Sequence, residues 1–455
     1  MAKPQDSTCG IVGLGYVGLT LAVNFDRAGY ETIGYDIDDE KIAALQQHRD
    51  ATGEYDEETI RESEITFTTD PAGFRRCDYV FVALPTPIDE FGTPDLSALE
   101  AACETVGRSI SPDTVIVVES TVYPGATREV VRPAVTRGTS EQGEVPFRLG
   151  YSPERIVPGG ENAFADVTKV VSAEDEATLH ELGALYGSVI DADVHLSTSI
   201  EAAEAAKCLE NVQRDVNIGF VNEFTLACHH IDLDLDPHDV LEIARTKWNF
   251  HDYRPGIVGG HCIPVDPHYL RHKFQEAGFD PRLLRAARSV NQQMAEHVKT
   301  LTVAALCEAK AARAVPVGSA TTMDDVPAHG HLPDAVTDAE VLLLGFGYKP
   351  NVADVRNSGV EQIAASLSAV VRRVRGYDPF HDGERAIDSF DFDVQSRLTV
   401  DGVDALVLLA PHEELRNLDL ETVAAEMNEN PVFVDVEAAY DPTAATESGF
   451  TYRRL

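Results

Sequence analysis

The residues best suited to chemistry lie in one glycine-rich stretch, residues 256–267, which reads GIVGGHCIPVDP. Glycines let a backbone pass close to a ligand, so a cysteine at position 262 could be presented to a substrate as a nucleophile. If Asp266 opens a helix, it would lie about one turn from Cys262, within reach of one water molecule. The alternative is a small buried thiol, because unpaired cysteine often packs as a core residue.

A second group of polar residues falls on one predicted helix. Residues 199–231 contain a single glycine and no proline, which predicts one long central helix. Glu204, Lys207 and Asn211 recur on it at i, i+3 and i+7, so they share a face. A lysine beside an amide can hold negative charge on an oxygen or a phosphate. A solvated surface lysine is the alternative.

The chain opens with a pattern typical of dinucleotide binding. Residues 8–13 predict a buried strand, the sequence GLGYVG occupies positions 13–18, and residues 19–28 predict a helix. A second strand is expected at 31–35 and ends at Asp36. Strand, glycine turn, helix and second strand with a terminal acid form the Rossmann fingerprint.

Each glycine of the fingerprint has its own expected role. Gly13 makes the tight turn, Gly15 lets a pyrophosphate approach, and Gly18 packs the helix on the strand. Asp36 is expected to bond both ribose hydroxyls and to repel a 2′-phosphate, which predicts NAD over NADP. The other cofactor-binding candidates are Tyr16, Val17, Lys41, Thr86 and Thr121. The alternative is a glycine turn that only packs.

Further strands are predicted at 78–84, 114–118 and 147–151, each followed by a polar loop. Thr121 and Glu154 lie in two of these loops, at the sheet edge where open α/β sheets bind ligands. The commoner fate of such residues is a helix cap or an exposed position.

The C-terminal part predicts a second α/β domain. More helices are expected at 96–109, 237–245, 282–310 and 360–370, and more strands at 340–344, 371–377, 405–409 and 431–434. The Gly345-x-Gly347 pair is an incomplete fingerprint, so no second dinucleotide is expected, whereas Lys349 and Arg356 could hold phosphates. Residues 311–339 show no periodicity and predict a linker or insertion.

The predicted fold class is α/β, with two Rossmann-like doubly wound domains joined by a helical central domain with one long helix. The predicted domains are 1–195 for NAD, 196–311 with the cysteine loop and a dimerisation surface, a linker at 312–339, and 340–455 for the second nucleotide.

The amino-acid composition excludes several classes of binding partner. The 455 residues include 76 acidic and 37 basic side chains, a net charge of −39, which disfavours nucleic acid and anionic membranes. Acids spread over the whole chain are typical of proteins adapted to high salt, where charge repulsion is screened within about 3 Å at 1 M. No long apolar run or signal-peptide core is present, so a cytoplasmic protein without a membrane partner is expected. The 7 cysteines form no CxxC pair, which indicates reduced thiols and no zinc or other metal site.

These motifs together resemble the UDP-glucose/GDP-mannose dehydrogenase superfamily over about residues 8–440. The similarity is greatest to the UDP-N-acetylhexosamine 6-dehydrogenases. It rests on the fingerprint and on the segments STVYPG at 120–125, YSPERIVPG at 151–159, KWNF at 247–250 and RPGIVGGHC at 254–262. Ile257 stands where UDP-glucose dehydrogenases usually carry a glycine, which weakens the UDP-glucose alternative.

The resemblance implies a homodimer or higher homo-oligomer and a four-electron oxidation of a UDP-sugar C6 alcohol by two NAD. Cys262 would form a thiohemiacetal and then a thioester, Lys207 and Asn211 would hold the charge on the C6 oxygen, and Thr121, Glu154 and Asp266 would position or activate water. The substrate-binding candidates are Glu154, Lys207, Asn211, Phe250, Arg254, Gly259, Lys349 and Arg356.

Two other classes stay open. A two-electron hydroxyacid dehydrogenase would share the fingerprint and the lysine–asparagine helix but would need no cysteine loop. A catalytically idle nucleotide-sugar sensor would need neither the cysteine nor the lysine.

Overall fold

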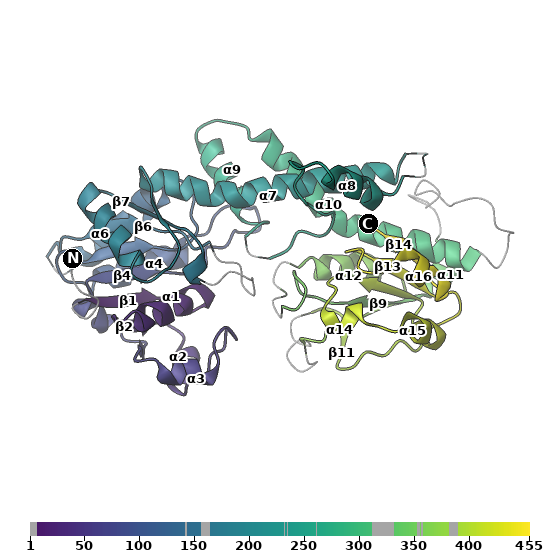
Figure 1. The fold of residues 1–455 in the computed structure, drawn as a ribbon, viewed down its shortest axis with the longest axis horizontal. Coiled ribbons are helices and arrows are strands. Elements are labelled where there is room, and N and C mark those ends of the chain that lie inside the picture. Colours follow the sequence, from purple (N-terminus) through teal and green to yellow (C-terminus); the bar gives the residue numbers. More distant parts are fainter. Residues whose placement is uncertain are drawn as a thin grey trace. The chain divides into compact units, whose positions relative to one another are not determined.

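The computed structural model describes residues 7–141, 143–155, 164–231, 233, 235–260, 262–311, 332–352, 355, 358–381 and 390–455. The chain forms two compact units (Figure 1). Unit 1 comprises Met1–Asn211 and Val265–Asp280, and unit 2 comprises Val212–Pro264 and Pro281–Leu455. The boundary falls within the longest helix of the N-terminal half, α7 (Ile200–Cys228). Arg356 and most of the predicted linker, residues 312–331, lie outside the described residues.

Unit 1 is built on an 8-stranded sheet with the order β3-β2-β1-β4-β5-β6-β7-β8 in the described part of the chain. Its strands are β1 (Thr8–Val12), β2 (Glu31–Tyr35), β3 (Thr66–Thr68), β4 (Tyr79–Val82), β5 (Val115–Val118), β6 (Arg148–Tyr151), β7 (Lys169–Ala173) and β8 (Val194–Leu196). Neighbouring strands are parallel except β6 and β7, which pair antiparallel. The sheet reverses at β1, with β2 on one side and β4 on the other, which is the doubly wound arrangement predicted from the fingerprint.

Most of the helices of unit 1 follow one of its strands. The helices are α1 (Tyr16–Arg27), α2 (Asp39–Gln46), α3 (Glu57–Glu62), α4 (Ser97–Gly107), α5 (Arg132–Ser140), α6 (Glu176–Tyr186) and α9 (Asp266–Glu276). Short turns of other helix types lie at Pro71–Arg76, Thr127–Val131 and Phe164–Asp166. Helix α1 begins at Tyr16 and not at Leu19 as predicted, because a helix can start directly after Gly15 in an extended conformation.

Two long helices confirm the predicted helical central region. The single long helix expected at 199–231 is α7, and the helix expected at 282–310 is α10 (Arg282–Ala311). Between them lies α8 (Pro237–Arg245), whose first turn is capped by Asp236. The long helix α7 was recognisable because residues 199–231 contain a single glycine and no proline.

Unit 2 contains a 6-stranded, fully parallel sheet with the order β11-β10-β9-β12-β13-β14. Its strands are β9 (Glu340–Leu344), β10 (Arg373–Tyr377), β11 (Asp393–Gln395), β12 (Ala405–Leu408), β13 (Val432–Asp435) and β14 (Thr451–Arg454). Its short helices are α11 (Asp334–Thr337), α12 (Val360–Ser368), α14 (Glu413–Arg416), α15 (Leu420–Glu426) and α16 (Pro442–Glu447).

The central strand β9 shows why this sheet is covered on both faces. Val341 and Leu343 belong to one buried cluster with residues of α10 and α12, while Leu342 and Leu344 belong to another with Leu415 of α14. Side chains alternate between the faces of a strand, so a continuous apolar run needs two layers of cover.

One part of the predicted linker belongs to this core. Val336 in α11 and Ala339 before β9 are buried against α10. The sequence analysis predicted a linker or insertion over residues 312–339 and did not recognise α11, because a four-residue helix is too short to show a periodicity.

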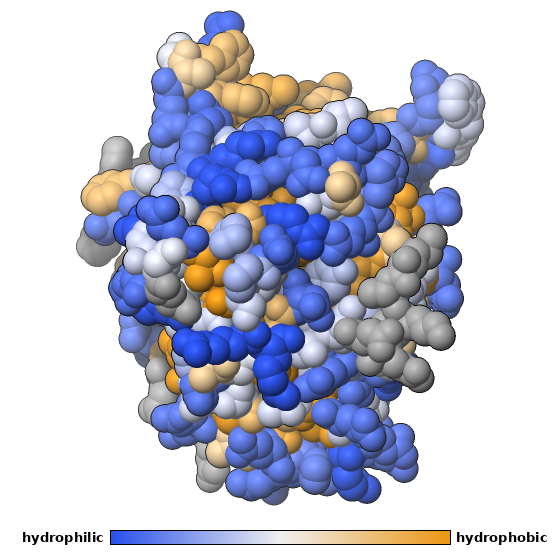
Figure 2. Space-filling view, turned by 90° about the vertical axis from the view of Figure 1, so that its left-hand side faces the viewer, coloured by the Kyte–Doolittle hydropathy of each residue, from blue (hydrophilic) through white to orange (hydrophobic). Residues whose placement is uncertain are grey.

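The surface is rich in polar residues on the face seen in Figure 2. One face of the molecule is dominated by hydrophilic residues, with hydrophobic residues showing only in small areas between them (Figure 2). Among the described residues, no helix combines the length and the apolar character needed to cross a bilayer.

Candidate active site

The glycine turn of unit 1 has the geometry that a dinucleotide needs. Gly13 adopts φ +87°, and a side chain there would lie 2.6 Å from the carbonyl oxygen of Ala83. A Cβ on Gly18 would lie 1.7 Å from the oxygen of Gly13, so helix and strand touch at this point as predicted. A Cβ on Gly15 would meet nothing within 4 Å, which leaves open space beside the start of α1. The first N–H groups of that helix, at Tyr16 and Val17, are the donors that bind phosphate in such folds.

Asp36 closes the other side of this site. It follows β2, is buried, and accepts hydrogen bonds from the backbone of Leu14 at 2.8 Å and Asp38 at 3.0 Å and from Lys41 Nζ at 2.7 Å. Burial alone would raise the pKa of Asp36, but these donors outweigh it and lower the pKa, so the carboxylate is ionised. Open space at Gly15, a helix N-terminus and an ionised acid together fit NAD.

The loops after β4 and β5 are tied together at the same edge of the sheet. Thr86 Oγ1 donates to the carbonyl oxygen of Thr121 at 2.7 Å, and the Tyr269 hydroxyl on α9 donates to the carbonyl oxygen of Thr86. Ser120 adds bonds to both backbone groups of Leu84. Thr86 and Thr121 therefore lie side by side where the sequence placed a ligand.

Three further predicted residues meet at the start of α9. Asp266 opens this helix, as the spacing suggested, and is buried. Asn211 Nδ2 donates to Asp266 Oδ2 at 2.6 Å, and Lys207 is buried close enough to act on the same carboxyl through its charge. Burial raises the pKa of Asp266 to about 6, although Lys207 and the Asn211 hydrogen bond work against it.

Cys262 lies in the turn before α9 and is the exposed member of the seven cysteines. Cys307 is half-buried and the other five are buried. Burial raises the pKa of Cys9, Cys103 and Cys208, which makes those thiols poor nucleophiles. Cys262 belongs to unit 2, whereas Lys207, Asn211 and Asp266 belong to unit 1.

Glu154 lies in the loop after β6 and has partners that sequence reasoning missed. Its backbone N–H donates to the carbonyl oxygen of Glu119 at 3.3 Å, and its carboxylate accepts from Lys169 Nζ at 3.3 Å. Lys169 in turn donates to Glu119 at 2.7 Å. A lysine at the head of a buried apolar run, in a chain so poor in lysine, was the signal that could have identified it.

Glu204 shares a helix face with Lys207 but has a different task. Its carboxylate accepts from the backbone of Gly125 at 2.5 Å and of Thr127 at 2.9 Å. Burial raises the pKa of Glu204 to about 7, against the effect of these bonds. Glu204 therefore holds the loop that follows Thr121.

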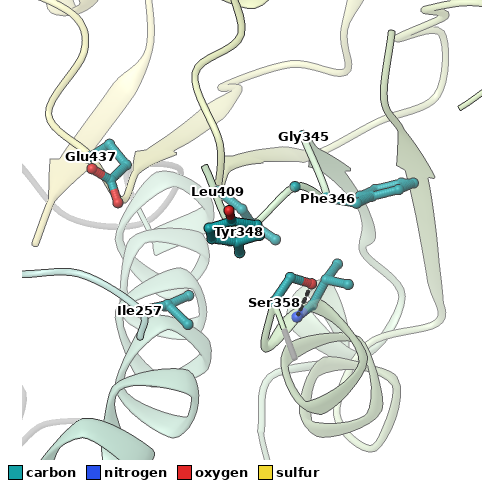
Figure 3. Close-up of a pocket in the computed structure, with 9 residues that line it drawn as sticks. Ile257, Gly345, Phe346, Tyr348, Ser358, Leu409 and Glu437 are labelled. Atoms are coloured by element: carbon teal, nitrogen blue, oxygen red, sulfur yellow. Dashed lines mark hydrogen bonds between the residues drawn. The ribbon is translucent and has the colours of Figure 1, made fainter. Parts of the chain in front are cut away.

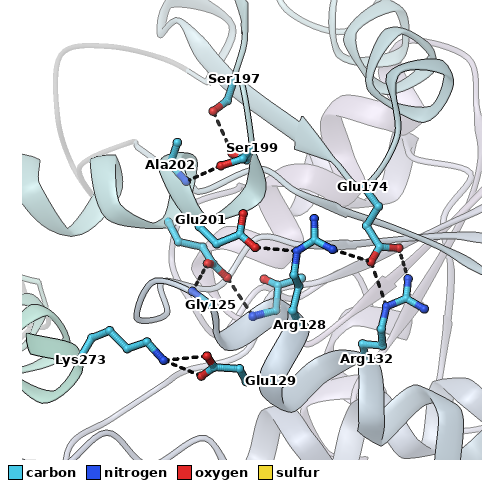
Figure 4. Close-up of polar contacts among 12 residues, drawn as sticks. Gly125, Arg128, Glu129, Arg132, Glu174, Ser197, Ser199, Glu201, Ala202 and Lys273 are labelled. Atoms are coloured by element: carbon cyan, nitrogen blue, oxygen red, sulfur yellow. Dashed lines mark hydrogen bonds and ion pairs between the residues drawn. The ribbon is translucent and has the colours of Figure 1, made fainter. Parts of the chain in front are cut away.

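Ion pairs fix the same loop from outside. Arg128 bonds Glu201 at 2.6 Å, and both Arg128 and Arg132 bond Glu174 (Figure 4). In the same view, Lys273 of α9 bonds both carboxylate oxygens of Glu129 at 2.7 Å.

Unit 2 has its own small pocket at the carboxyl ends of β9, β12 and β13 (Figure 3). It is lined by Ile257, Gly345, Phe346, Gly347, Tyr348, Ser358, Val360, Leu409 and Glu437. Lys349 follows Tyr348 directly, and Gly260 packs against the Tyr348 ring, with its Cβ position 3.0 Å from Cδ2. Gly259 immediately precedes that contact. The glycine loop and the Tyr348 loop thus meet at one pocket.

Four predicted substrate residues of unit 2 are not among the residues that line this pocket: Phe250, Arg254, Gly259 and Lys349. Phe250 is half-buried, and Arg254 is 60% exposed, with Nε 3.8 Å from Asp252. Glu437, which the sequence analysis did not select, reaches into the pocket from the end of β13, on the side opposite Ser358 (Figure 3). Burial, with Asp435 beside it, raises the pKa of Glu437 to about 7, against Arg254 and Arg416.

The chain matches models of three domains of one protein family, two of which are nucleotide-binding domains. Residues 7–190 match the NAD binding domain of the UDP-glucose/GDP-mannose dehydrogenase family, residues 201–293 match its central domain, and residues 342–442 match its UDP binding domain.

Individual relatives cover nearly the whole chain. It is 38% identical to Protein CapL of Staphylococcus aureus over 89% of each chain. It is 35% identical to a UDP-N-acetyl-D-glucosamine 6-dehydrogenase of Pseudomonas aeruginosa, over 96% of this chain and 98% of that protein. Among solved structures, a UDP-D-ManNAc dehydrogenase from Pyrococcus horikoshii superposes with a TM-score of 0.81 at 27% identity, over 98% of this chain and 99% of that one.

The three domain matches follow one another in the order of the fold, and the first of them falls on the Gly13–Asp36 site. The chain belongs to the UDP-glucose/GDP-mannose dehydrogenase family and is an NAD-dependent nucleotide-sugar dehydrogenase.

Proposed function

We propose that this enzyme oxidises the C6 alcohol of a UDP-N-acetylhexosamine, with UDP-N-acetylglucosamine as the first candidate, to the uronate. The balanced reaction is R–CH₂OH + 2 NAD⁺ + H₂O → R–COO⁻ + 2 NADH + 3 H⁺. The substrate class is supported by the relative from Pseudomonas aeruginosa, whose name states that sugar. The product would serve surface polysaccharide or glycoprotein glycan synthesis.

The observation that supports the mechanism most directly is the buried group of Lys207, Asn211 and Asp266 at the start of α9. The Lys207 ammonium and the Asn211 amide would stabilise negative charge on the C6 oxygen, a role in which losing one donor typically costs about 10²–10³ in rate. Asp266, with a pKa of about 6, can take up and return a proton near neutral pH. NAD, when bound, accepts a hydride from C6 in each oxidation.

Cys262 would link the two oxidations. Its sulfur attacks the C6 aldehyde to form a C–S bond, and the resulting thiohemiacetal loses a second hydride to become a thioester. Water then adds at C6 and the C–S bond breaks, which releases the carboxylate and the free thiol. In this proposal Thr121, Glu154 and Asp266 position or activate that water. The exposure of Cys262, beside five buried cysteines, supports its choice as the nucleophile.

Lys349 is the proposed phosphate ligand of the unit 2 pocket, because it follows Tyr348 at the pocket wall. Phe250, Gly259 and Arg254 would lie along the nucleotide. Lys349→Ala should raise KM for the UDP-sugar; an unchanged KM would remove this role. We also infer a homodimer or higher homo-oligomer, and domain boundaries near residues 195, 311 and 340.

The decisive experiment is an assay of the purified protein in molar KCl with NAD and, separately, UDP-N-acetylglucosamine, its galacto and manno epimers, and UDP-glucose. Two NADH per sugar consumed is the expected result. One NADH would indicate a two-electron dehydrogenase, and none would indicate a sensor. Turnover confined to UDP-glucose would overturn the substrate while leaving the chemistry standing.

Cys262→Ser tests the covalent step, with Cys307→Ser as the matched control because Cys307 is only half-buried and lies in α10. We expect uronate formation to fall to background in the first variant and to persist in the second. Near-normal uronate output from Cys262→Ser would contradict the nucleophile.

A further inference from the structure

A charged cluster behind Glu154 is fully enclosed by unit 1. Lys169 and Glu119 are 3% and 1% exposed, and the Tyr186 hydroxyl donates to Glu119 Oε1. Lys169 Nζ donates to Glu119 Oε2 at 2.7 Å, Glu154 Oε2 at 3.3 Å and the Pro153 carbonyl oxygen at 3.4 Å. An ammonium group has three donors, so all three are matched.

The topology of the sheet explains how a lysine comes to this place. Lys169 is the first residue of β7, and β7 runs antiparallel to β6, with Tyr151 paired to Ser172. The beginning of β7 therefore lies beyond the carboxyl end of β6, where Glu154 emerges. A parallel strand would have placed its first residue at the opposite edge of the sheet, away from the ligand side.

The cluster contains two acidic groups, Glu119 and Glu154, and one basic group, Lys169. Burial would lower the pKa of Lys169, but Glu119 and Glu154 outweigh it and raise the pKa, so the ammonium stays charged. Burial also raises the pKa of Glu119 to about 7, which Lys169 opposes and Glu154 reinforces. Two carboxylates thus share one cation, and a proton added to either leaves a neutral buried pair and no isolated charge.

We propose that Lys169, itself held by Glu119, is a positioning residue that orients the Glu154 carboxylate toward the water that cleaves the thioester. This inference rests on the proposed function, because it needs a hydrolytic step in which Glu154 takes part. When Glu154 accepts the proton of water, the charge of Lys169 remains balanced by Glu119. Lys169 and Glu119 touch neither sugar nor cofactor in this scheme and act only through Glu154.

The test is a kinetic comparison of Lys169→Met with the native enzyme. We expect kcat to fall on the order of 10²-fold, the typical cost of a misplaced catalytic group, while KM changes by less than about threefold. Because only hydrolysis is slowed, the variant should release a rapid burst of two NADH per active site. An intact-mass measurement after acid quench should show the uronyl group on the protein. Lys273→Met, which breaks the surface pair with Glu129, is the control and should show neither burst nor adduct.

Removing Lys169 alone leaves the buried Glu119 carboxylate without its cation, whereas Glu154 keeps the hydrogen bond from the Arg155 N–H at 2.6 Å, so Lys169→Met could fail to fold. The double variant Lys169→Met/Glu119→Gln removes that unpaired charge and should give the same burst and adduct. A fall in kcat without burst or adduct, or an unchanged kcat, in the folded variant would overturn the inference.

A double-mutant cycle separates positioning from a general structural effect. If Lys169 acts through Glu154, Lys169→Met should cost little further activity in a Glu154→Gln background. Full additivity of the two losses would overturn the positioning role. An adduct in Glu154→Gln but none in the Lys169 variants would refute this inference alone. No adduct in any variant, together with uronate output from Cys262→Ser, would refute the proposed function.

Discussion

The two α/β domains repeat the same turn at their first strand. Gly13 after β1 and Gly345 after β9 have φ +87° and +76°, and their N–H groups donate to Tyr35 and Tyr377 at 2.8 and 2.9 Å. Neither position has room for a side chain, since Cβ would lie 2.6 Å from the Ala83 oxygen and 2.1 Å from the Ala410 oxygen. The second domain lacks the full glycine fingerprint, but it has the same glycine turn after its first strand.

The acids at the ends of β2 and β10 also correspond. Asp36 accepts from Leu14 N at 2.8 Å, and Asp378 accepts from Phe346 N at 2.5 Å. The difference lies in the third partner. Asp36 pairs with Lys41, whose side chain is 27% exposed, whereas Asp378 bonds His412, which is fully buried.

The helices that follow the two turns differ as well. In unit 1, α1 begins directly after Gly15, so its unpaired N–H groups border the turn. In unit 2, α12 begins only at Val360, and the loop between carries Tyr348 and Lys349. The same strand and turn thus support a dinucleotide site where the helix starts directly after the turn and the partner of the acid, Lys41, is partly exposed. In unit 2, a loop separates the turn from the helix, and both the acid Asp378 and its partner His412 are fully buried. There the same strand and turn support a different nucleotide site.

The largest expected effect is on the shared turn. Gly13→Ala and Gly345→Ala should each destabilise the protein by roughly 3 kcal/mol, because a positive φ and a collision with backbone act together. Chemical denaturation monitored by circular dichroism would measure the change in the free energy of unfolding. Gly402→Ala, also at positive φ but with open space around it, is the control for backbone strain alone and should cost less. Equal losses at all three positions would show that the close approach contributes nothing.

The second prediction separates the two acids by function. Asp36→Ala should lower kcat/KM for NAD by about 10- to 100-fold, since charge-assisted hydrogen bonds are worth about 1.5–3 kcal/mol. Activity with NADP should change little or rise. Asp378→Asn should leave KM for NAD unchanged, because its carboxylate is used inside its own domain. A loss of NAD affinity in Asp378→Asn would contradict the division between the domains.

The comparison also shows what the sequence could predict. Long helices such as α7 and α10 were predictable because they run for many residues without a proline, and β9 was predictable because it is a continuous apolar run. The three-residue strands β3, β8 and β11 were missed because they are too short to show an alternation. Local spacing was enough to predict that Gly13 lies in a tight turn and that Asp266 opens a helix.

Residues that act through long-range packing escaped prediction. Lys169 reaches Glu154 only because β7 reverses direction, and strand direction is not encoded in a five-residue pattern. Glu437 enters the pocket of unit 2 from the end of β13, far in sequence from Tyr348. Glu204 was associated with Lys207 by helical spacing, yet its carboxylate bonds the backbone at Gly125 and Thr127.

The third prediction concerns the partners of the two acids. His412→Phe should cost about 2 kcal/mol of stability, because it leaves the buried Asp378 carboxylate without one of its donors. Lys41→Met should cost less than about 1 kcal/mol, since Lys41 is partly exposed and its ion pair is screened. Equal losses in parallel urea titrations would mean that burial does not distinguish the two pairs.

The smallest expected effect is on the pH dependence of stability, because the pKa of Asp36 is lowered and the pKa of Glu437 is raised in the folded protein. The pKa of Asp36 is lowered in the folded protein, so its contribution to stability is present above its ordinary range and is lost as pH falls. The pKa of Glu437 is raised from an ordinary 4.5 to about 7, so the folded state binds a proton that the unfolded state releases. Its effect is therefore a loss of stability as pH rises from about 4.5 to 7.

Glu437→Gln should remove that loss and raise Tm more at pH 8 than at pH 6. An ionised carboxylate in the pocket also repels the diphosphate of a UDP-sugar, with Arg254 and Arg416 compensating in part. The KM of the native enzyme should therefore rise with pH through about 7 by less than tenfold, and the variant should show a flatter profile. Asp36→Asn is the matched control, since it changes the pH dependence of stability only at the acid end and not between pH 6 and 8. A native KM independent of pH between 6 and 8, with an unchanged profile in Glu437→Gln, would show that this carboxyl does not face the nucleotide.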